Sequence, residues 1–138
     1  MLKDRDFVII DRCFDAACKK NKTDGNARLY CKLDNGPYVY GTNRMKTHTM
    51  QNTFFQHNRF QVYLHAEIDA IVNFLRTRHP EDLMGASLHI ARAKWDGEKY
   101  IKAIAKPCRG CESALRWFGV KRMVFSMDEF TISEQWLW

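Results

Sequence analysis

The sequence has no apolar segment long enough to cross a membrane, which would require about 18 consecutive residues. The longest such segment near the start of the 138-residue chain is Phe7–Ile10, with four residues. It is also too short for the core of a signal peptide, and acidic residues flank it. We therefore expect no membrane partner and a cytoplasmic location, or a host cytoplasm if the gene is viral.

The sequence also lacks the even set of cysteines that a disulfide framework needs. It contains five, and no signal peptide directs it to an oxidising compartment. Cys13, Cys18 and Cys31 lie among apolar residues, and we expect them to be small core or boundary residues. Only Cys108 and Cys111 have a spacing that suggests chemistry.

No stretch of the chain is strongly basic, although the formal net charge is +6. A positive charge suits an anionic partner such as a nucleotide or single-stranded nucleic acid, but dispersed cations equally form an ordinary solvated surface. No Ser/Gly linker, internal repeat or shift in composition divides the sequence. We expect a single domain over residues 1–138.

The spacing of apolar residues predicts an alternation of helices and strands. Helices are expected over Asp4–Lys20, from about His65 to Arg78, and between Pro107 at the first helical position and Gly119. The strands ARLYCKL and YVYGT flank the turn sequence DNGP and predict a β-hairpin over residues 27–42. A long structured loop is expected over residues 43–63.

The second half of the chain predicts further strands, at ASLHIARA, in an extended piece after the turn in KWDGEKYIKAIA, and at KRMVFSM. Only eleven residues follow Met127, whereas a parallel return strand needs a crossover of about a dozen or more. Any strand in the tail FTISEQWLW must therefore run antiparallel to KRMVFSM. The order of elements predicts an α/β fold, a sheet with helices packed on it.

His65, Cys108 and Cys111 are candidate metal ligands. Cys108 and Cys111 are three residues apart at a helix start, where they share one face and the helix N-terminus favours thiolates. Two thiolates and one imidazole form a three-ligand zinc site that keeps its fourth position for water, whose pKa zinc can lower to about 7. Glu67 is two residues from His65, a spacing that turns it away from the same metal, so it can carry protons instead.

Other interpretations of these residues remain open. A lone Cys-x-x-Cys motif is also typical of a redox pair, although the order of elements is not thioredoxin-like. It could equally be half of a structural zinc site, for which His48 and His57 are awkwardly spaced. His65 alone would more often be a packed or capping histidine. The joint pattern at two helix starts favours the zinc site.

His-Ala-Glu at 65–67 together with Pro-Cys-x-x-Cys at 107–111 resembles the zinc-dependent cytidine and deoxycytidylate deaminase superfamily. The resemblance covers the order of elements over nearly the whole chain. It implies a three-layer α-β-α sandwich with a mixed sheet of about five strands, and a homo-oligomer. It also implies that hydroxide on zinc attacks C4 of cytosine or C6 of adenine, while Glu67 transfers the protons.

The resemblance further implies contacts with the substrate. Asn43, after the second strand, matches an asparagine that contacts the base or sugar, although it could equally be a turn residue, and the backbone of Ala66 matches a contact with the base. The first ligand is histidine, as in deoxycytidylate and tRNA adenosine deaminases. The short tail, by contrast, resembles the antiparallel ending of cytidine deaminases.

The segment after Asn43 bears on the choice of substrate. Arg44, Lys46 and His48 are expected at the edge of the pocket, where Arg and Lys could bind a phosphate or simply form a solvated loop. We expect a deaminase of a free cytosine nucleotide such as deoxycytidine monophosphate (dCMP). The alternatives are a deaminase of cytosine or adenine within single-stranded DNA or RNA, and a non-catalytic zinc-stabilised binding module. Retention of Glu67 argues against the last.

Overall fold

The computed structural model describes residues 1–20, 28–35, 38–45, 48–54 and 63–138. Within these ranges four α-helices, one short 3₁₀ helix and six strands follow one another along the chain. Their bounds are α1 Asp4–Cys18, β1 Arg28–Asp34, β2 Tyr38–Thr42, α2 Thr49–Phe54, α3 Ala66–Leu75, η2 Pro80–Leu83, β3 Ser87–Trp95, β4 Tyr100–Ala103, α4 Arg109–Trp117, β5 Arg122–Ser126 and β6 Ile132–Trp136.

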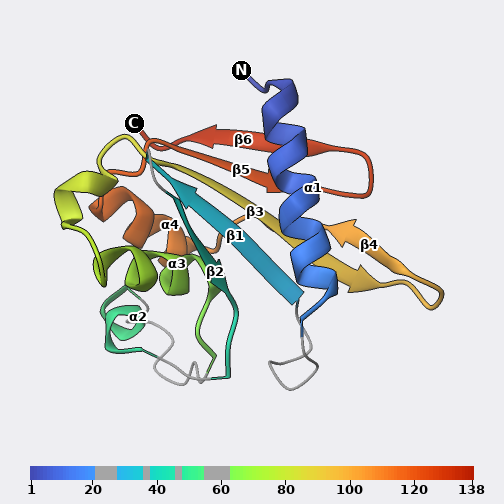
Figure 1. The fold of residues 1–138 in the computed structure, drawn as a ribbon, viewed down its shortest axis with the longest axis horizontal. Coiled ribbons are helices and arrows are strands. Elements are labelled where there is room, and N and C mark those ends of the chain that lie inside the picture. Colours follow the sequence, from blue (N-terminus) through green and yellow to red (C-terminus); the bar gives the residue numbers. More distant parts are fainter. Residues whose placement is uncertain (21–27, 36–37, 46–47, 55–62) are drawn as a thin grey trace.

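The strands form one mixed sheet, in the order β2-β1-β3-β5-β6, with β4 paired to β3 outside this path (Figure 1). β3 and β5 are parallel, and every other described pair is antiparallel. The predicted hairpin strands are confirmed as β1 and β2. β6 runs antiparallel to β5, which confirms the topology expected for the tail.

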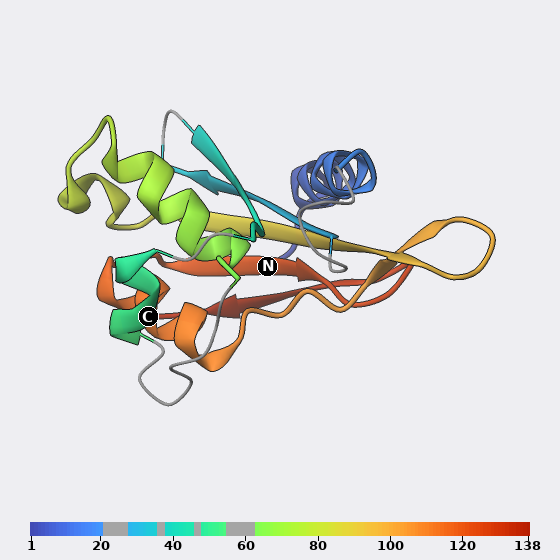
Figure 2. The ribbon, with the colours of Figure 1, turned by 90° about the horizontal axis from the view of Figure 1, so that it is seen from below.

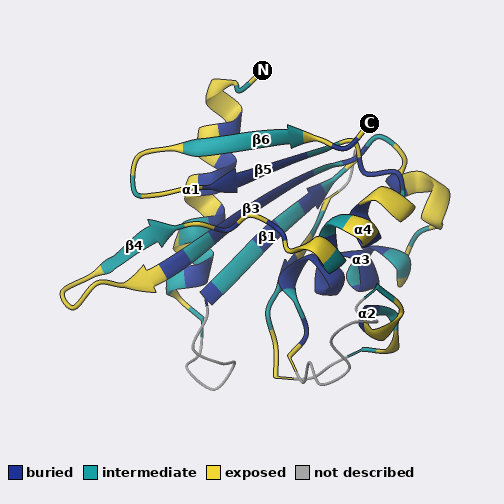
Figure 3. Ribbon diagram, turned by 180° about the vertical axis from the view of Figure 1, so that it is seen from behind, coloured by how far each residue is buried: buried dark blue, intermediate teal, exposed yellow. Residues whose placement is uncertain are grey.

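Helices cover both faces of the sheet, which confirms the expected three-layer sandwich. Leu88 and Ile90 of β3 belong to the main core with α3 and α4, whereas Ala91 faces the other way and packs in a smaller cluster with α1. Figure 2 shows the sheet nearly edge-on. Figure 3 shows α2, α3 and α4 together on the face turned away from α1, with the buried residues concentrated between them and the sheet.

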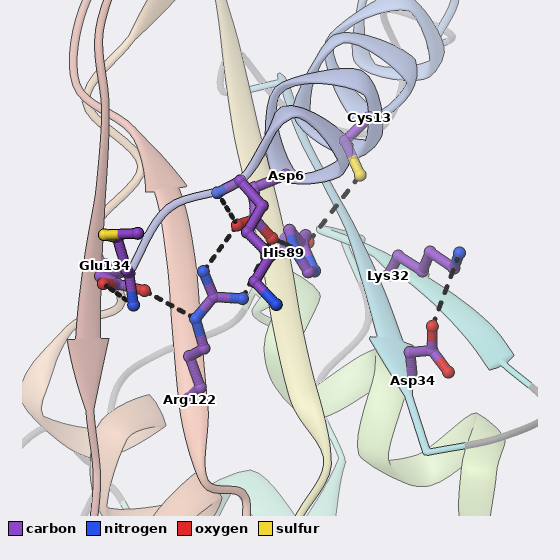
Figure 4. Close-up of polar contacts among 9 residues, drawn as sticks. Asp6, Cys13, Lys32, Asp34, His89, Arg122 and Glu134 are labelled. Atoms are coloured by element: carbon purple, nitrogen blue, oxygen red, sulfur yellow. Dashed lines mark hydrogen bonds and ion pairs between the residues drawn. The ribbon is translucent and has the colours of Figure 1, made fainter.

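A buried ionic cluster anchors the first turn of α1 to the sheet. The carboxylate of Asp6 accepts hydrogen bonds from Arg122 Nη2 at 2.7 Å and lies 2.8 Å from His89 Nε2. Arg122 also pairs with Glu134 of β6. Figure 4 shows these side chains converging from α1, β3, β5 and β6. Because Asp6 and His89 are nearly inaccessible to solvent, the cluster fixes where α1 docks on the sheet.

Gly41 allows α3 to lie directly against β2. A Cβ atom at this position would lie 2.3 Å from the carbonyl oxygen of Ala66 and 2.5 Å from the backbone nitrogen of Ala70. Real Cβ atoms do not approach backbone atoms so closely, so only glycine fits here. This close packing determines the position of the first turn of α3, which follows His65.

Three details differ from the sequence-based prediction. Residues 43–63 were expected to be loop, but they contain α2, whose helical state depends on tertiary contacts such as the stacking of Phe54 on Phe118. α3 ends at Leu75 rather than near Arg78. After Leu75 the backbone forms a tighter turn before Pro80. Pro107 lies before α4 rather than at its first position, because Cys108 is the extended N-cap residue.

Candidate active site

Two helix N-termini meet on the face of the sheet opposite α1, and they bring the three predicted metal ligands together. His65 is the N-cap residue of α3, Cys108 is the N-cap residue of α4, and Cys111 lies in the first turn of α4. One ligand atom from each residue lies within 4.8 Å of the others. In the described part of the chain no other group of three such side chains converges in this way.

The distances between the three ligand atoms fit a tetrahedral zinc ion. His65 Nδ1 lies 3.7 Å from the sulfur of Cys108 and 3.5 Å from the sulfur of Cys111. Usual Zn–N and Zn–S bond lengths place nitrogen and sulfur about 3.6 Å apart in such a site. The nitrogen–sulfur distances of the site therefore suit a zinc ion bound by these three side chains.

The two thiols differ strongly in acidity. Hydrogen bonds from Cys111 and His65 outweigh the effect of burial and together lower the pKa of Cys108 to about 4. Burial raises the pKa of Cys111 well above its ordinary value, and the neighbouring Cys108 adds to the shift. Burial acts to lower the pKa of His65, but the hydrogen bond with Cys108 outweighs it and the pKa is raised. One thiolate is thus ready for a metal, and the second forms when the metal arrives.

Glu67 lies in the first turn of α3, beside the three ligands but outside their set. Its side chain is buried, and this burial raises the pKa of the carboxyl group above its ordinary value. A carboxyl group with a raised pKa can both accept and donate a proton near neutral pH. The position of Glu67 therefore suits proton transfer next to a metal.

Gln51 of α2 supports the site, and sequence reasoning missed it. Its side chain is fully buried, and its oxygen accepts a hydrogen bond from the backbone N–H of His65 at 2.8 Å. Its amide group donates to the carbonyl oxygen of Tyr63. Nothing in the segment TMQNTF signals this role, because it depends on a helix that the sequence pattern does not predict.

A cavity of about 500 Å³ opens onto the site. Its wall includes the metal ligands His65 and Cys108, the carboxyl group of Glu67, and two of the predicted substrate contacts, Asn43 and Ala66. The remaining lining residues are Leu29, Tyr63, Leu64, Arg92, Ile104, Ala105 and Lys106. Sequence reasoning assigned no role to Arg92 or Lys106.

The other predicted substrate contacts lie away from the cavity wall or outside the described residues. Nε of Arg44 pairs with Asp69 at 3.2 Å. Nδ1 of His48 accepts a hydrogen bond from the backbone N–H of Met50, at the start of α2. Lys46 lies outside the residues that the structure describes, and so does His57, which was considered as a ligand of a structural zinc site.

The oxygen of the Asn43 side chain accepts a hydrogen bond from the backbone N–H of Leu29 at 3.0 Å, which orients the amide group within the cavity wall. The carbonyl oxygen of Ala66 accepts a hydrogen bond from the thiol of Cys31. Both residues are held by β1, so the wall beside Glu67 is tied to the sheet.

Three potential ligands at two helix starts, beside a buried carboxyl group, could hold a zinc ion next to a cavity with room for a small substrate. The sequence matches the family model for the cytidine and deoxycytidylate deaminase zinc-binding region over residues 8–127, and the chain belongs to this family. Zinc is thereby confirmed as the cofactor, and the protein is a deaminase of cytosine-containing substrates. None of the curated proteins matches the sequence.

Solved structures of two enzymes have a similar fold. The apo dCMP deaminase of the cyanophage S-TIM5 is 16% identical, with a TM-score of 0.60 over 92% of this chain and 86% of the phage chain. The cytidine deaminase of Burkholderia pseudomallei is 12% identical, with a TM-score of 0.62 over 99% of this chain and 94% of the bacterial chain. Both likenesses concern the fold, which is confirmed as cytidine deaminase-like.

Proposed function

We propose that the protein hydrolytically deaminates the cytosine base of a free nucleotide, with dCMP as the first candidate. The observation that carries this proposal is the placement of the buried Glu67 beside His65 and Cys108 in one cavity of about 500 Å³. A volume of this order suits a single small ligand. The fold likeness to an enzyme described as a dCMP deaminase supports the same choice.

The residues of the cavity have separate roles in the proposed reaction. His65, Cys108 and Cys111 hold zinc, which supplies a water molecule activated near neutral pH. Glu67 would take one proton from the attacking water and pass it to the ring nitrogen. It would then carry the second proton of that water, from the hydroxyl formed at C4, to the departing amine, which leaves as ammonia. Asn43 and the backbone of Ala66 orient the base, and Gln51 keeps His65 in place. A role for Glu67 in proton transfer separates this proposal from a non-catalytic zinc module.

Tyr63 favours a second candidate function, the deamination of cytosine or adenine within single-stranded DNA or RNA. Its ring is 49% exposed and lines the same cavity. An exposed aromatic ring at the mouth of a site can stack on the base next to the target. The single-domain organisation, a homo-oligomeric state and a cytoplasmic location stay predictions. Within the described residues, no helix is both long and apolar enough to span a membrane.

A screen for ammonia release from the zinc-loaded protein tests the proposal. The substrates are deoxycytidine, dCMP, their ribose and adenine counterparts, and single-stranded oligonucleotides with one cytosine. We expect dCMP to have the highest kcat/KM. Turnover of oligonucleotides with none of the monomers would select the second candidate. Release from none of these compounds would refute both.

A further inference from the structure

Arg92 reaches the active-site cavity from the middle of the sheet. It belongs to β3 and lies on the same face of the strand as Leu88 and Ile90, whose side chains pack in the core beneath α3 and α4. Arg92 lines the same cavity as His65 and Glu67. A central strand thus places a cation in the wall of a site whose metal ligands come from helix starts.

The guanidinium group of Arg92 lacks a partner in the described part of the protein. Its Nε atom is buried without a hydrogen-bond partner, a condition shared there only with Nδ1 of His89. No described carboxylate forms an ion pair with Arg92, whereas Arg122 pairs with Asp6 and with Glu134. A half-buried charge without a counter-ion is costly, because it loses hydration without a compensating interaction. An ordered water could satisfy the single N–H group but would leave the charge uncompensated.

The other charges of the cavity do not compensate Arg92. Glu67 is the one carboxylate among the described lining residues, and it serves proton transfer in the proposed function. Lys106, which is exposed, adds a second cation to the wall. We therefore expect the substrate to carry the anionic group that neutralises these two cationic side chains.

We propose that Arg92, assisted by Lys106, binds the 5′-phosphate of the substrate nucleotide. This inference rests on the proposed function, and it names the group that distinguishes a nucleotide from a nucleoside. The planar fork of a guanidinium group matches two oxygens of a phosphate and forms strong, charge-assisted hydrogen bonds with them. The ligand class is a terminal phosphate monoester, because a phosphate that reaches the central strand lies inside a cavity of about 500 Å³, a volume that suits a single small ligand rather than a continuing strand.

Arg44 was the residue expected from the sequence to bind the phosphate, and its surroundings differ from those of Arg92. Its guanidinium group pairs with the nearly buried Asp69, which also accepts a hydrogen bond from the backbone N–H of Thr42. This pairing ties the end of β2 to α3. The charge of Arg44 already has a counter-ion in Asp69, whereas that of Arg92 has none among the described residues.

Steady-state kinetics of the zinc-loaded enzyme on dCMP and deoxycytidine tests the proposal. We expect Arg92→Gln to lower kcat/KM for dCMP roughly ten- to a hundredfold, because one charge-assisted contact is lost. The loss should come mainly from KM and be far smaller for deoxycytidine. Arg92→Lys should recover part of the dCMP activity, and Lys106→Ala should shift it in the same direction by less.

Lys94→Gln is the matched control. Lys94 lies two residues further along β3, carries the same charge, is exposed and does not line the cavity. It should leave both substrates unaffected. Equal losses on dCMP and deoxycytidine in Arg92→Gln, or no loss on either, would overturn the phosphate assignment.

A binding measurement separates failure of this inference from failure of the proposed function. The zinc-loaded Glu67→Gln variant is titrated calorimetrically with dCMP and with deoxycytidine, with and without Arg92→Gln. If the enzyme deaminates no monomer yet binds dCMP in an Arg92-dependent way, the proposed function fails and the phosphate site stands. If dCMP is preferred as substrate but Arg92→Gln changes neither its binding nor its kinetics, the proposed function stands and the phosphate site is refuted.

Discussion

The side-chain oxygen of Gln51 accepts a hydrogen bond from the backbone N–H of His65, so α2 holds the residue that precedes α3 and is the proposed histidine ligand of zinc. Replacement of Gln51 by Met removes this hydrogen bond and the one that its amide group donates to the carbonyl oxygen of Tyr63, both of which are partly buried. We expect a loss of about 1–3 kcal/mol in the free energy of unfolding. Urea denaturation of the zinc-loaded protein measures it, together with zinc affinity, which should fall. Asn52→Ala, at the exposed neighbouring position, should change neither quantity.

The second prediction concerns Gly41, because any Cβ atom at this position would overlap the backbone of α3. Gly41→Ala must push α3 away from β2 and shift His65 from the two cysteines. We expect marked destabilisation and weaker zinc binding, seen in thermal denaturation and zinc titration. Gly97→Ala serves as a comparison, since a Cβ there would meet no atoms and only its positive φ opposes the change. A Gly41→Ala protein with native zinc affinity would contradict the close packing.

Zinc loading should release protons. Cys111 keeps its proton in the metal-free site, because burial and the neighbouring Cys108 hold its pKa well above the ordinary value. Since zinc binds the thiolate, uptake of about one ion per chain should release at least about one proton near pH 7. Calorimetry in buffers of different ionisation enthalpy measures this release. Cys108→Ala should lose tight zinc binding and stability, and Cys18→Ala, outside the site, should lose neither.

Glu67→Gln should retain zinc and fold but lose most turnover. The amide preserves the shape of the side chain yet cannot transfer protons, and a positioned acid–base group typically contributes about 10²–10⁴-fold. Ammonia release is compared between wild type and variant at equal zinc content. Near-native activity would remove Glu67 from the mechanism. Loss of zinc from the variant would instead identify Glu67 as a ligand.

The cluster beneath α1 should make the protein sensitive to acid. Burial lowers the pKa of His89, although its hydrogen bond with Asp6 opposes this shift. Burial would raise the pKa of Asp6, but hydrogen bonds from Arg122 and His89 outweigh it and hold this pKa well below its usual range. The folded state therefore binds fewer protons than the unfolded chain. The contribution of His89 to the free energy of unfolding is complete above about pH 6.5 and is lost as the pH falls further. The contribution of Asp6 is complete above about pH 4 and is likewise lost at lower pH.

Urea denaturation across pH 8 to pH 4, compared between wild type and His89→Gln, measures the contribution of His89. The zinc ligands contribute equally to both proteins, so the difference in slope isolates His89. The variant should lose less stability than wild type as the pH falls through about 6.5. Parallel curves would contradict the assignment.

Local patterns in the sequence were sufficient to predict most of the helices and strands and to group the candidate metal ligands. Helical spacing identified α1, turn chemistry identified the β1–β2 hairpin, and the shortness of the tail determined the direction of β6. His65, Cys108 and Cys111 could be grouped because zinc chemistry restricts ligand types and spacings, and the family resemblance linked the two motifs. These features depend on residues close in sequence or on a recognisable pair of motifs.

Contacts between distant segments were decided only by the tertiary structure. α2 has no sequence signature, because its stability comes from Gln51 and Phe54 packing against other helices. Arg92 resembles any arginine in a strand until the fold places it in the wall of the same cavity as Glu67, without a counter-ion in the described part of the protein. Arg44, by contrast, stands next to Asn43 in the sequence, yet the approach of α3 to β2 gives it Asp69 as a partner. Burial and ion pairing are properties of the whole packed chain, so local spacing cannot reveal them.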